Sequence, residues 1–312
     1  MTPGRVTIVV LTCNRREEVL RTLAHVVDAY PTLPIVVVDN ASRDGTADAV
    51  TRRHPHVTVV RLAANLGAAG RNAGVAASAT PYVAFCDDDT WWLPGGIERA
   101  VEVLDAHPRL AVVTARILVG ERRHEDPTNA LMAASPFPNP LGVPGTALVG
   151  LLAGACVMRR AAFIEAGGYQ PRFFLGREEA LLAIDLMARG WHMAYLPDAT
   201  VCHWPSPVRD GVARRRLMRR NALWCAWLRR PLRSALRATN AWLAHARDDG
   251  TLRADLRDTL MALPWLLRER RVVPAHVEQA LGVLDRLAAR EALATRTPAN
   301  MQQSALARTR VV

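Results

Sequence analysis

The chain contains no lysine, so all 40 of its Lys-plus-Arg residues are arginines, set against 29 acidic residues. The formal net charge is +11 at pH 7. A bias toward GC-rich codons accounts for the arginine without any functional role. The charge still has a physical consequence, because a basic surface attracts phosphates, nucleic acids and anionic lipid headgroups.

Cysteine is also scarce: the five cysteines are scattered, odd in number and never spaced as CxxC. This argues against a disulfide framework or a zinc site and favours a reducing compartment. No apolar run approaches the roughly 20 residues that span a bilayer, and no signal-peptide pattern is visible. We therefore expect a cytoplasmic protein, with peripheral contact at the inner face of the membrane as an open alternative.

Half of the residues are hydrophobic, which predicts a globular chain. The first 120 residues alternate β-branched apolar runs with segments of helical periodicity. Strands are predicted at 6–12, 35–38, 57–62, 82–86 and 111–119, and helices at 16–29, 44–53, 67–78 and 94–106. Such alternation indicates parallel βαβ units, whose ligands bind at the carboxyl ends of the strands.

The remainder of the chain is less regular. Residues 120–148 show no clear period and predict a long loop. Helices are expected at 160–166 and 178–189, and two short strands at 193–196 and 200–202. Three arginine-rich helical stretches follow at 213–244, 251–270 and 274–294, where Pro264 should kink or break the second. We expect residues 295–312 to be frayed.

Three adjacent carboxylates, Asp87, Asp88 and Asp89, follow an apolar strand. They repel one another unless a cation neutralises them, and Mg²⁺ prefers carboxylate oxygens together with substrate phosphates. On an extended segment Asp87 and Asp89 would point to the same side. The alternative is a solvated acidic turn.

The triplet is the last of an ordered series of polar clusters at strand ends. The earlier members are Thr12-Cys13-Asn14-Arg15, Asp39-Asn40-Ala41-Ser42, Asn65-Leu66-Gly67 and Gly70-Arg71-Asn72-Ala73-Gly74. This series resembles nucleotide-sugar glycosyltransferase family 2, and the resemblance covers roughly residues 5–205. It implies the α/β GT-A fold: a Rossmann-like, mostly parallel central sheet flanked by helices. A helical C-terminal extension follows.

The resemblance also implies roles for residues of the first half. Asp39 corresponds to the position that contacts uracil, and its carboxylate is suited to accept a hydrogen bond from a base imide. Arg71 is either near the base or diphosphate or on the surface. A metal, Mg²⁺ or Mn²⁺, is assigned to Asp89, Asp87 and His203. The predicted nucleotide-sugar-binding residues are Thr12, Asn14, Arg15, Asp39, Asn65, Gly67, Arg71, Asp87 and Asp88.

The second half of the resemblance ends in an acidic pair, Glu178 and Glu179, at a predicted helix start. In the family the second acid is the catalytic base. The resemblance therefore assigns this role to Glu179, with Glu178 as the alternative base. Acids at this position also complement a helix dipole without any catalysis. The sequence departs from the family where Leu181 and Asp185 replace an Asp and an Arg. An Asp185–Arg189 ion pair one turn later is the expected substitute.

The expected activity is inverting transfer of a sugar from a nucleotide-sugar donor, with UDP favoured and dTDP or GDP open, to a hydroxyl of a glycan, lipid-linked or small-molecule acceptor. A sugar nucleotidyltransferase is one alternative, although it would carry a phosphate-binding lysine. The other is a non-catalytic basic protein that binds membranes or nucleic acid on a degenerate GT-A scaffold. The arginine-rich segment 213–228 suits either an anionic membrane or a solvated face of the protein, whereas no nucleic-acid-binding motif accompanies it.

These patterns predict a domain organisation. Residues 1–208 form the GT-A domain, with 1–120 as the nucleotide-sugar-binding half and 121–208 as the acceptor and catalytic half. Residues 209–294 form a basic helical extension, and 295–312 a disordered tail.

Overall fold

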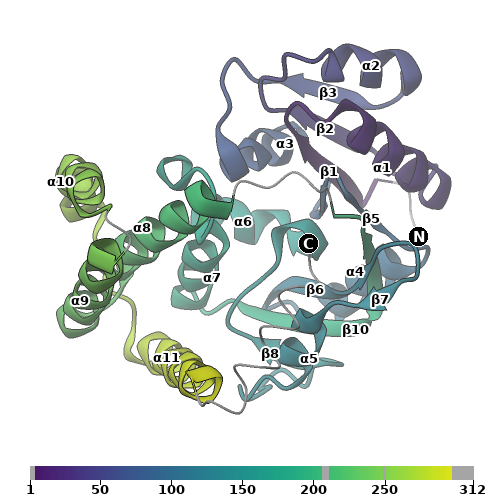
Figure 1. Ribbon diagram of the computed structural model, residues 1–312. Helices are drawn as coiled ribbons and strands as arrows, with labels where there is room; N and C mark the ends of the chain where they lie inside the picture. Colours follow the sequence, from purple (N-terminus) through teal and green to yellow (C-terminus); the bar gives the residue numbers. More distant parts are fainter. Residues whose placement is uncertain (1–3, 206–210, 249–250, 297–312) are drawn as a thin grey trace. The chain divides into compact units, whose positions relative to one another are not determined.

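A single mixed β-sheet organises the computed structural model, which describes residues 4–205, 211–248 and 251–296 (Figure 1). The strands of its main path follow the order β3-β2-β1-β4-β9-β6-β10-β5. Their bounds are β1 Val6–Thr12, β2 Ile35–Asp39, β3 Thr58–Arg61, β4 Tyr82–Asp87, β5 Thr90–Trp92, β6 Leu110–Val119, β9 Cys156–Arg159 and β10 His192–His203. The short strands β7 (His124–Glu125) and β8 (Thr146–Leu148) pair with β6 and β10.

The strand directions bring distant polar residues to one edge of the sheet. Strands β1 to β4 pair in parallel, and β10 runs parallel to β6. Strand β9 is antiparallel to both β4 and β6, so β6 and β10 point the same way as β4. The carboxyl ends of β1, β2, β4 and β10 are Thr12, Asp39, Asp87 and His203. The mostly parallel, helix-flanked sheet confirms the predicted GT-A architecture.

Helices cover both faces of this sheet because its strands are apolar on both sides. Val6, Ile8 and Val10 of β1 pack with helices α1, α2 and α4, whereas Val9 belongs to a second core with α3, α6 and α7. The bounds are α1 Arg16–Ala29, α2 Thr46–Arg53, α3 Arg71–Ala77, α4 Gly96–Ala106, α6 Arg160–Ala166 and α7 Glu178–Ala188. Strands buried on both faces read as continuous hydrophobic runs, which is why the sequence predicted them.

The second half of the chain differs from expectation in three places. Residues 120–148 are not a structureless loop, because they contain β7, β8 and helix α5 (Pro127–Ala133), which Asp126 caps. The two short strands predicted after residue 190 are one strand, β10, interrupted by a bulge between Leu196 and Thr200. Helix α10 (Leu252–Glu269) runs through Pro264 without ending there.

The C-terminal region consists of helices. Contacts divide the chain into one compact unit that extends to Val272 and a second that begins at Val273. Helices α8 (Gly211–Arg229), α9 (Leu232–Asp248) and α10 belong to the first, and α11 (Ala275–Arg296) to the second. Most of the predicted tail, 297–312, lies outside the described residues. Among the helices described, none combines the length and apolar character needed to cross a bilayer.

Helix α8 is not the free amphipathic helix that its arginines suggested. Its apolar face is covered by protein: Trp224 lies between Phe173 and Trp265, with ring centroids 6.2 and 5.6 Å away. Arg216 is paired with Asp255 and Asp258 of α10 at 2.5 and 2.8 Å. The buried apolar residues of α8 include Leu223, Trp224, Cys225, Ala226 and Leu228. These described residues of the helix therefore pack as part of the domain.

The predicted ion pair between Asp185 and Arg189 is wrong. The carboxylate of Asp185 instead accepts two hydrogen bonds from Arg229 of α8, at 2.5 and 3.0 Å. Arg189 donates to the Asp185 backbone carbonyl at 2.9 Å. Both members of the Asp185–Arg229 pair are largely buried, and a two-bond arginine–carboxylate pair is the strongest geometry for such a contact.

This arrangement predicts how Asp185 couples to its two arginine neighbours. Removing one partner of a largely buried pair leaves an uncompensated charge and should cost about 3–5 kcal/mol. We expect Asp185→Asn and Arg229→Met each to be strongly destabilised, and the double variant to be far more stable than the sum implies. Denaturant unfolding of the four proteins in this cycle measures the coupling. Arg189→Met should show little coupling to Asp185→Asn. Strong coupling to Arg189 and weak coupling to Arg229 would instead support the i,i+4 pair.

Candidate active site

The aspartate triplet lies where β4 gives way to β5. Strand β4 ends at Asp87, a turn holds Asp88 and Asp89, and β5 begins at Thr90. The extended geometry expected for the triplet is therefore wrong. The Thr90 hydroxyl accepts the Asp87 N–H at 2.7 Å and donates to the Gly154 carbonyl at 3.0 Å, which fixes the turn. Within this turn the Asp87 carboxylate pairs with Arg71, whereas those of Asp88 and Asp89 share Arg15.

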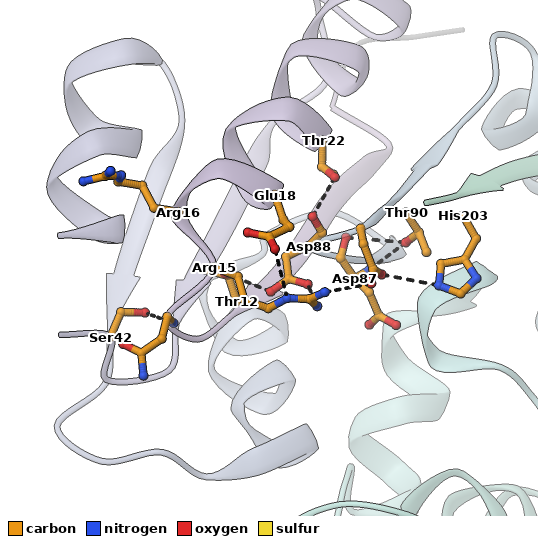
Figure 2. A network of polar contacts seen from close by, with 12 residues as sticks. Thr12, Arg15, Arg16, Glu18, Thr22, Ser42, Asp87, Asp88, Thr90 and His203 are labelled. Atoms are coloured by element: carbon orange, nitrogen blue, oxygen red, sulfur yellow. Dashed lines mark hydrogen bonds and ion pairs between the residues drawn. The ribbon is translucent and has the colours of Figure 1, made fainter. Parts of the chain in front are cut away.

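Arg15, which follows β1, neutralises two of the three acids. Its guanidinium donates to Asp88 and, at 3.1 Å, to Asp89 (Figure 2). Asp88 also accepts the Thr12 hydroxyl at 3.0 Å, and Thr22 of α1 donates to the Asp88 carbonyl at 2.7 Å. Burial raises the pKa of Asp88 to about 7, against the opposing pull of Arg15. The region expected to receive a diphosphate thus already contains a strong cation–acid pairing.

Asp89 meets His203 across the sheet. The Oδ1 atom of Asp89 lies 3.7 Å from Nε2 of His203, the last residue of β10. A carboxylate oxygen and an imidazole nitrogen facing each other at this distance suit adjacent positions around one divalent cation. No group of three or more His, Cys, Asp or Glu side chains around a possible metal is present in the described part of the chain. A metal bound here would therefore need further oxygen ligands from the diphosphate of the bound donor or from water, as Mg²⁺ sites commonly do.

Asp87 is held separately, by Arg71 of α3. Arg71 is 6% exposed and its guanidinium donates to the Asp87 carboxylate, so the surface position considered for it is wrong. Gly154 gives this carboxylate its space: a Cβ at residue 154 would lie 2.5 Å from Asp87 Oδ2. The Asp87 side chain remains 42% exposed, whereas Asp88 and Asp89 are buried.

The acidic pair stands at the start of α7, close to the same backbone segment. The Ala153 N–H donates to Glu179 Oε1 at 2.9 Å, and the next residue, Gly154, contacts Asp87. Burial raises the pKa of Glu179 to about 7, and the charge of Glu178 acts in the same direction. Burial also raises the pKa of Glu178. By residue, Glu178 is buried whereas Glu179 is partly exposed.

The remaining predicted residues lie at the ends of β1 and β2. Asp39 is buried and accepts the Ser42 N–H at 3.2 Å. Asn14 is exposed and accepts the Arg43 N–H at 2.7 Å. Asn65 accepts the Gly67 N–H at 2.8 Å. All three shape the loops at the sheet edge on which Arg15 and the aspartates also lie.

The glycines of this region serve packing within the protein. A Cβ at Gly67 would fall 1.9 Å from the Phe174 carbonyl oxygen, and one at Gly74 would fall 2.4 Å from Val9. Gly67 therefore permits the close approach of the Phe174 backbone. Trp92 and Trp91 are buried, which assigns them to the core beneath the site rather than to sugar stacking.

Several contributors escaped the sequence reasoning. Asn40 bridges the loop after β3 by accepting the Leu66 N–H at 2.8 Å and donating to the Gly67 carbonyl at 2.9 Å. Ala153 contributes only its backbone N–H, for which no sequence signal exists. Asn40 stood inside one of the polar clusters, and only its spatial neighbours reveal what it does.

A doubly covered, mostly parallel sheet with acids and a histidine at its carboxyl edge is the arrangement expected of a GT-A glycosyltransferase. Residues 7–167 match Glycosyl transferase family 2. The chain belongs to this family.

Known relatives agree with this class. The chain is 27% identical over 273 residues to N-acetylglucosaminyl-diphospho-decaprenol L-rhamnosyltransferase of Mycobacterium tuberculosis, covering 72% of this chain and 87% of that protein. Mannosyltransferase PcManGT from Pyrobaculum calidifontis, in complex with GDP-Man and Mn²⁺, aligns with a TM-score of 0.57, at 19% identity, over 98% of this chain and 84% of the other. GalNAc-T7 with UDP, GalNAc and Mn²⁺ aligns with a TM-score of 0.56, at 14% identity, over 73% of this chain and 48% of the other.

Proposed function

We propose that the protein is an inverting, metal-dependent glycosyltransferase that moves a sugar from a nucleotide-sugar donor to a hydroxyl of a lipid-linked acceptor. One observation carries the proposal. The Ala153–Gly154 segment contacts Asp87 of the acid triplet on one side and Glu179 on the other. Donor-side acids and a proton acceptor are thereby held within one site, as a displacement at a sugar carbon requires.

The donor half, residues 1–120, would hold the nucleotide at the strand ends. The buried Asp39 carboxylate accepts one backbone N–H and retains capacity for a base N–H. A pyrimidine imide suits this acceptor, so UDP is favoured, with dTDP and GDP as alternatives. The flanking positions assigned to the donor are Thr12, Asn14, Arg15, Asn65, Gly67, Arg71, Asp87 and Asp88. The acceptor half is assigned to residues 121–208.

The residues present fit a divalent cation. Asp89 Oδ1 and His203 Nε2 face each other at 3.7 Å, and Asp87 is the most exposed acid of the triplet. We assign Asp89 and His203, with Asp87, to Mg²⁺ or Mn²⁺. When bound, the cation would stabilise the negative charge of the departing diphosphate. The two solved relatives that contain Mn²⁺ support this choice of metal.

Glu179 is assigned as the general base. It would take the proton of the acceptor hydroxyl as that oxygen bonds to the anomeric carbon and the bond to the diphosphate breaks. Its pKa of about 7 suits a base near neutral pH, because the ideal catalytic pKa lies close to the working pH. Glu178 is buried, and the positive charge of Arg71 favours its ionised form. We assign Glu178 an indirect role, in which its charge raises the pKa of Glu179.

The acceptor class is inferred from the M. tuberculosis relative, whose name specifies a diphospho-decaprenol acceptor. A lipid-linked acceptor would bring the enzyme to a membrane surface. Helix α10 offers a surface for this contact. Exposed leucines and a methionine of this helix form an apolar stripe with arginines beside it: Arg253, Leu256, Arg257, Leu260, Met261, Leu263, Leu267 and Arg268. The acids Asp258 and Glu269 are also partly exposed, and they pair with Arg216 and Arg268. Because Asp255 and Asp258 pair with Arg216, this surface complements an anionic bilayer.

The metal assignment predicts that Asp89→Ala abolishes Mn²⁺-dependent binding of UDP while the fold is retained. The loss of one of the three assigned protein ligands removes the cation that attracts the diphosphate. Calorimetry with UDP, dTDP and GDP, with and without Mn²⁺, measures this. Asp48→Ala, an exposed acid on α2 paired with Arg61, is the matched control and should bind normally. Unchanged metal-dependent affinity in Asp89→Ala would contradict the assignment.

The base assignment predicts both a pH profile and a ranking of variants. A base must be deprotonated to act, so kcat/KM should rise with pH and level off above about 7, following the pKa of Glu179. Glu179→Gln should lower turnover by about 10²–10⁴-fold with little change in donor affinity.

Two comparisons make this result specific. Donor binding measured over the same pH range separates Glu179 from Asp88, whose pKa is also about 7. Glu178→Gln tests the register: a dead Glu178→Gln beside an active Glu179→Gln would move the base by one residue, and two active variants would place it elsewhere.

The membrane assignment predicts sedimentation with anionic liposomes at low salt and release at high salt, because salt screens the attraction. Leu260→Glu should weaken this binding by about tenfold or more, since it places a charge in the apolar stripe. Leu131→Glu on α5, of nearly equal exposure (63% against 64%), should bind like the wild type. Equal binding to neutral vesicles, or a concentration-dependent dimer disrupted by Leu260→Glu, would replace the bilayer with another occupant.

A further inference from the structure

The loop that leads into α7 has an unfavourable backbone conformation. Phe174 has φ 61° and ψ −67°, and the Leu175 N–H donates to the Phe173 carbonyl at 2.7 Å. These features define a γ-turn of the rare, strained kind with positive φ. Arg177, the residue before α7, also has a positive φ, of 68°. Such conformations persist only where surrounding structure enforces them.

Asn221 of α8 provides the enforcing contacts. Its side chain is fully buried, and its amide nitrogen donates to the carbonyls of Phe173, Leu175 and Gly176 at 2.8, 3.1 and 2.6 Å. Its Oδ1 accepts from Arg220 Nε and Nη2 at 3.1 and 3.0 Å. Because an arginine can only donate, this contact fixes the orientation of the amide and directs its N–H groups into the loop.

Other contacts hold the same loop from both sides. Arg220 donates to the carbonyls of Arg172 and Phe173, at 3.2 Å each. On the donor side, the Ala68 N–H donates to the Phe174 carbonyl at 2.7 Å. The loop therefore lies between the segment at residues 67–70 and α8, and Glu178 and Glu179 follow it directly.

Helix α8 also holds the other end of α7, through the pair between Asp185 and Arg229. Two fixed points along one helix determine where its first residues lie. Of the two, the Asn221 contact is the closer in sequence to the glutamates, because Gly176 stands only three residues before Glu179. The backbone N–H of Gly176 also helps to stabilise the Glu178 carboxylate.

We propose that Asn221 is a positioning residue for catalysis, which holds the strained 173–177 loop so that Glu179 meets the acceptor hydroxyl. This rests on the proposed role of Glu179 as the base. Asn221 touches no reacting atom in this arrangement. It gives the basic helical extension a function in the active site that is independent of membranes and nucleic acid.

The test compares Asn221→Asp with Asn240→Asp. The first keeps the shape and the contact to Arg220 but places an oxygen against three carbonyls. The second makes the same change on the exposed face of α9. We expect Asn221→Asp to lower kcat by about 10²-fold, the cost of a displacement near 1 Å, with metal-dependent UDP affinity unchanged. Asn240→Asp should match the wild type.

Two further measurements separate positioning from general destabilisation. Hydrogen exchange of the amides in 172–178 should quicken in Asn221→Asp, while that of the β1 and β4 amides should not. In the Asn221→Asp background, Glu179→Gln should lower kcat by a much smaller factor than in the wild type, because a displaced base already contributes little to the rate. Asn221→Ala removes the donors without adding charge and replaces the aspartate variant if that variant does not fold.

The outcomes distinguish the two proposals. A folded Asn221 variant with wild-type kcat and unchanged exchange in the loop would overturn the positioning role. Additive losses in the double variant would also overturn it. If Glu179→Gln alone retains wild-type turnover, the assignment of the base fails, and the exchange data still report whether Asn221 holds the loop.

Discussion

Mutual repulsion among three consecutive carboxylates is the constraint on which the site depends. The chain offsets it by dividing the carboxylates between two cations: Arg71 pairs with Asp87, and Arg15 pairs with both Asp88 and Asp89. These arginines come from different elements, at the ends of β1 and the start of α3. Neutralising the triplet therefore requires the sheet to be assembled, and the assembled sheet determines which acid remains exposed.

The strand order brings His203 and the acidic pair of α7 close to the aspartate triplet. Because β9 enters antiparallel between β4 and β6, the later strand β10 ends at the same edge as β4. His203 thereby reaches Asp89 although the two are far apart in sequence. The backbone just before β9 passes between Asp87 and Glu179. A single antiparallel strand thus joins the donor acids to the acidic pair of α7.

The sequence allowed the first half of the fold to be predicted well, for a physical reason. Strands β1, β2 and β4 are buried on both faces, so their apolar runs and the polar residues that end them were visible without any partner. The bounds predicted for β1 and α1 are those observed. The bulged β10 and helix α5 depend on cross-strand pairing and on caps such as Asp126, which a periodicity search does not detect.

The candidate site divides in the same way. Side chains placed by a strand end, such as Thr12, Asp39 and Asp87, were identifiable from local pattern. The partners of Asp185 and the contacts of Asn221 were not, because they lie on a helix whose arginines looked like a solvated or membrane-facing surface. Composition indicated charge on α8, whereas only packing shows that Arg216, Arg220 and Arg229 are bound to other parts of the protein.

The close approach of Gly154 to Asp87 has a consequence for how this sequence can diverge. A methyl group at residue 154 would occupy space that the Asp87 carboxylate already fills. Positions 87 and 154 are therefore not free to drift independently: a larger residue at 154 becomes acceptable only after the acid at 87 has been shortened or has turned away. Within descendants of this chain, a full-length carboxylate held in this position at 87 requires glycine at 154, although the two residues belong to different halves of the domain.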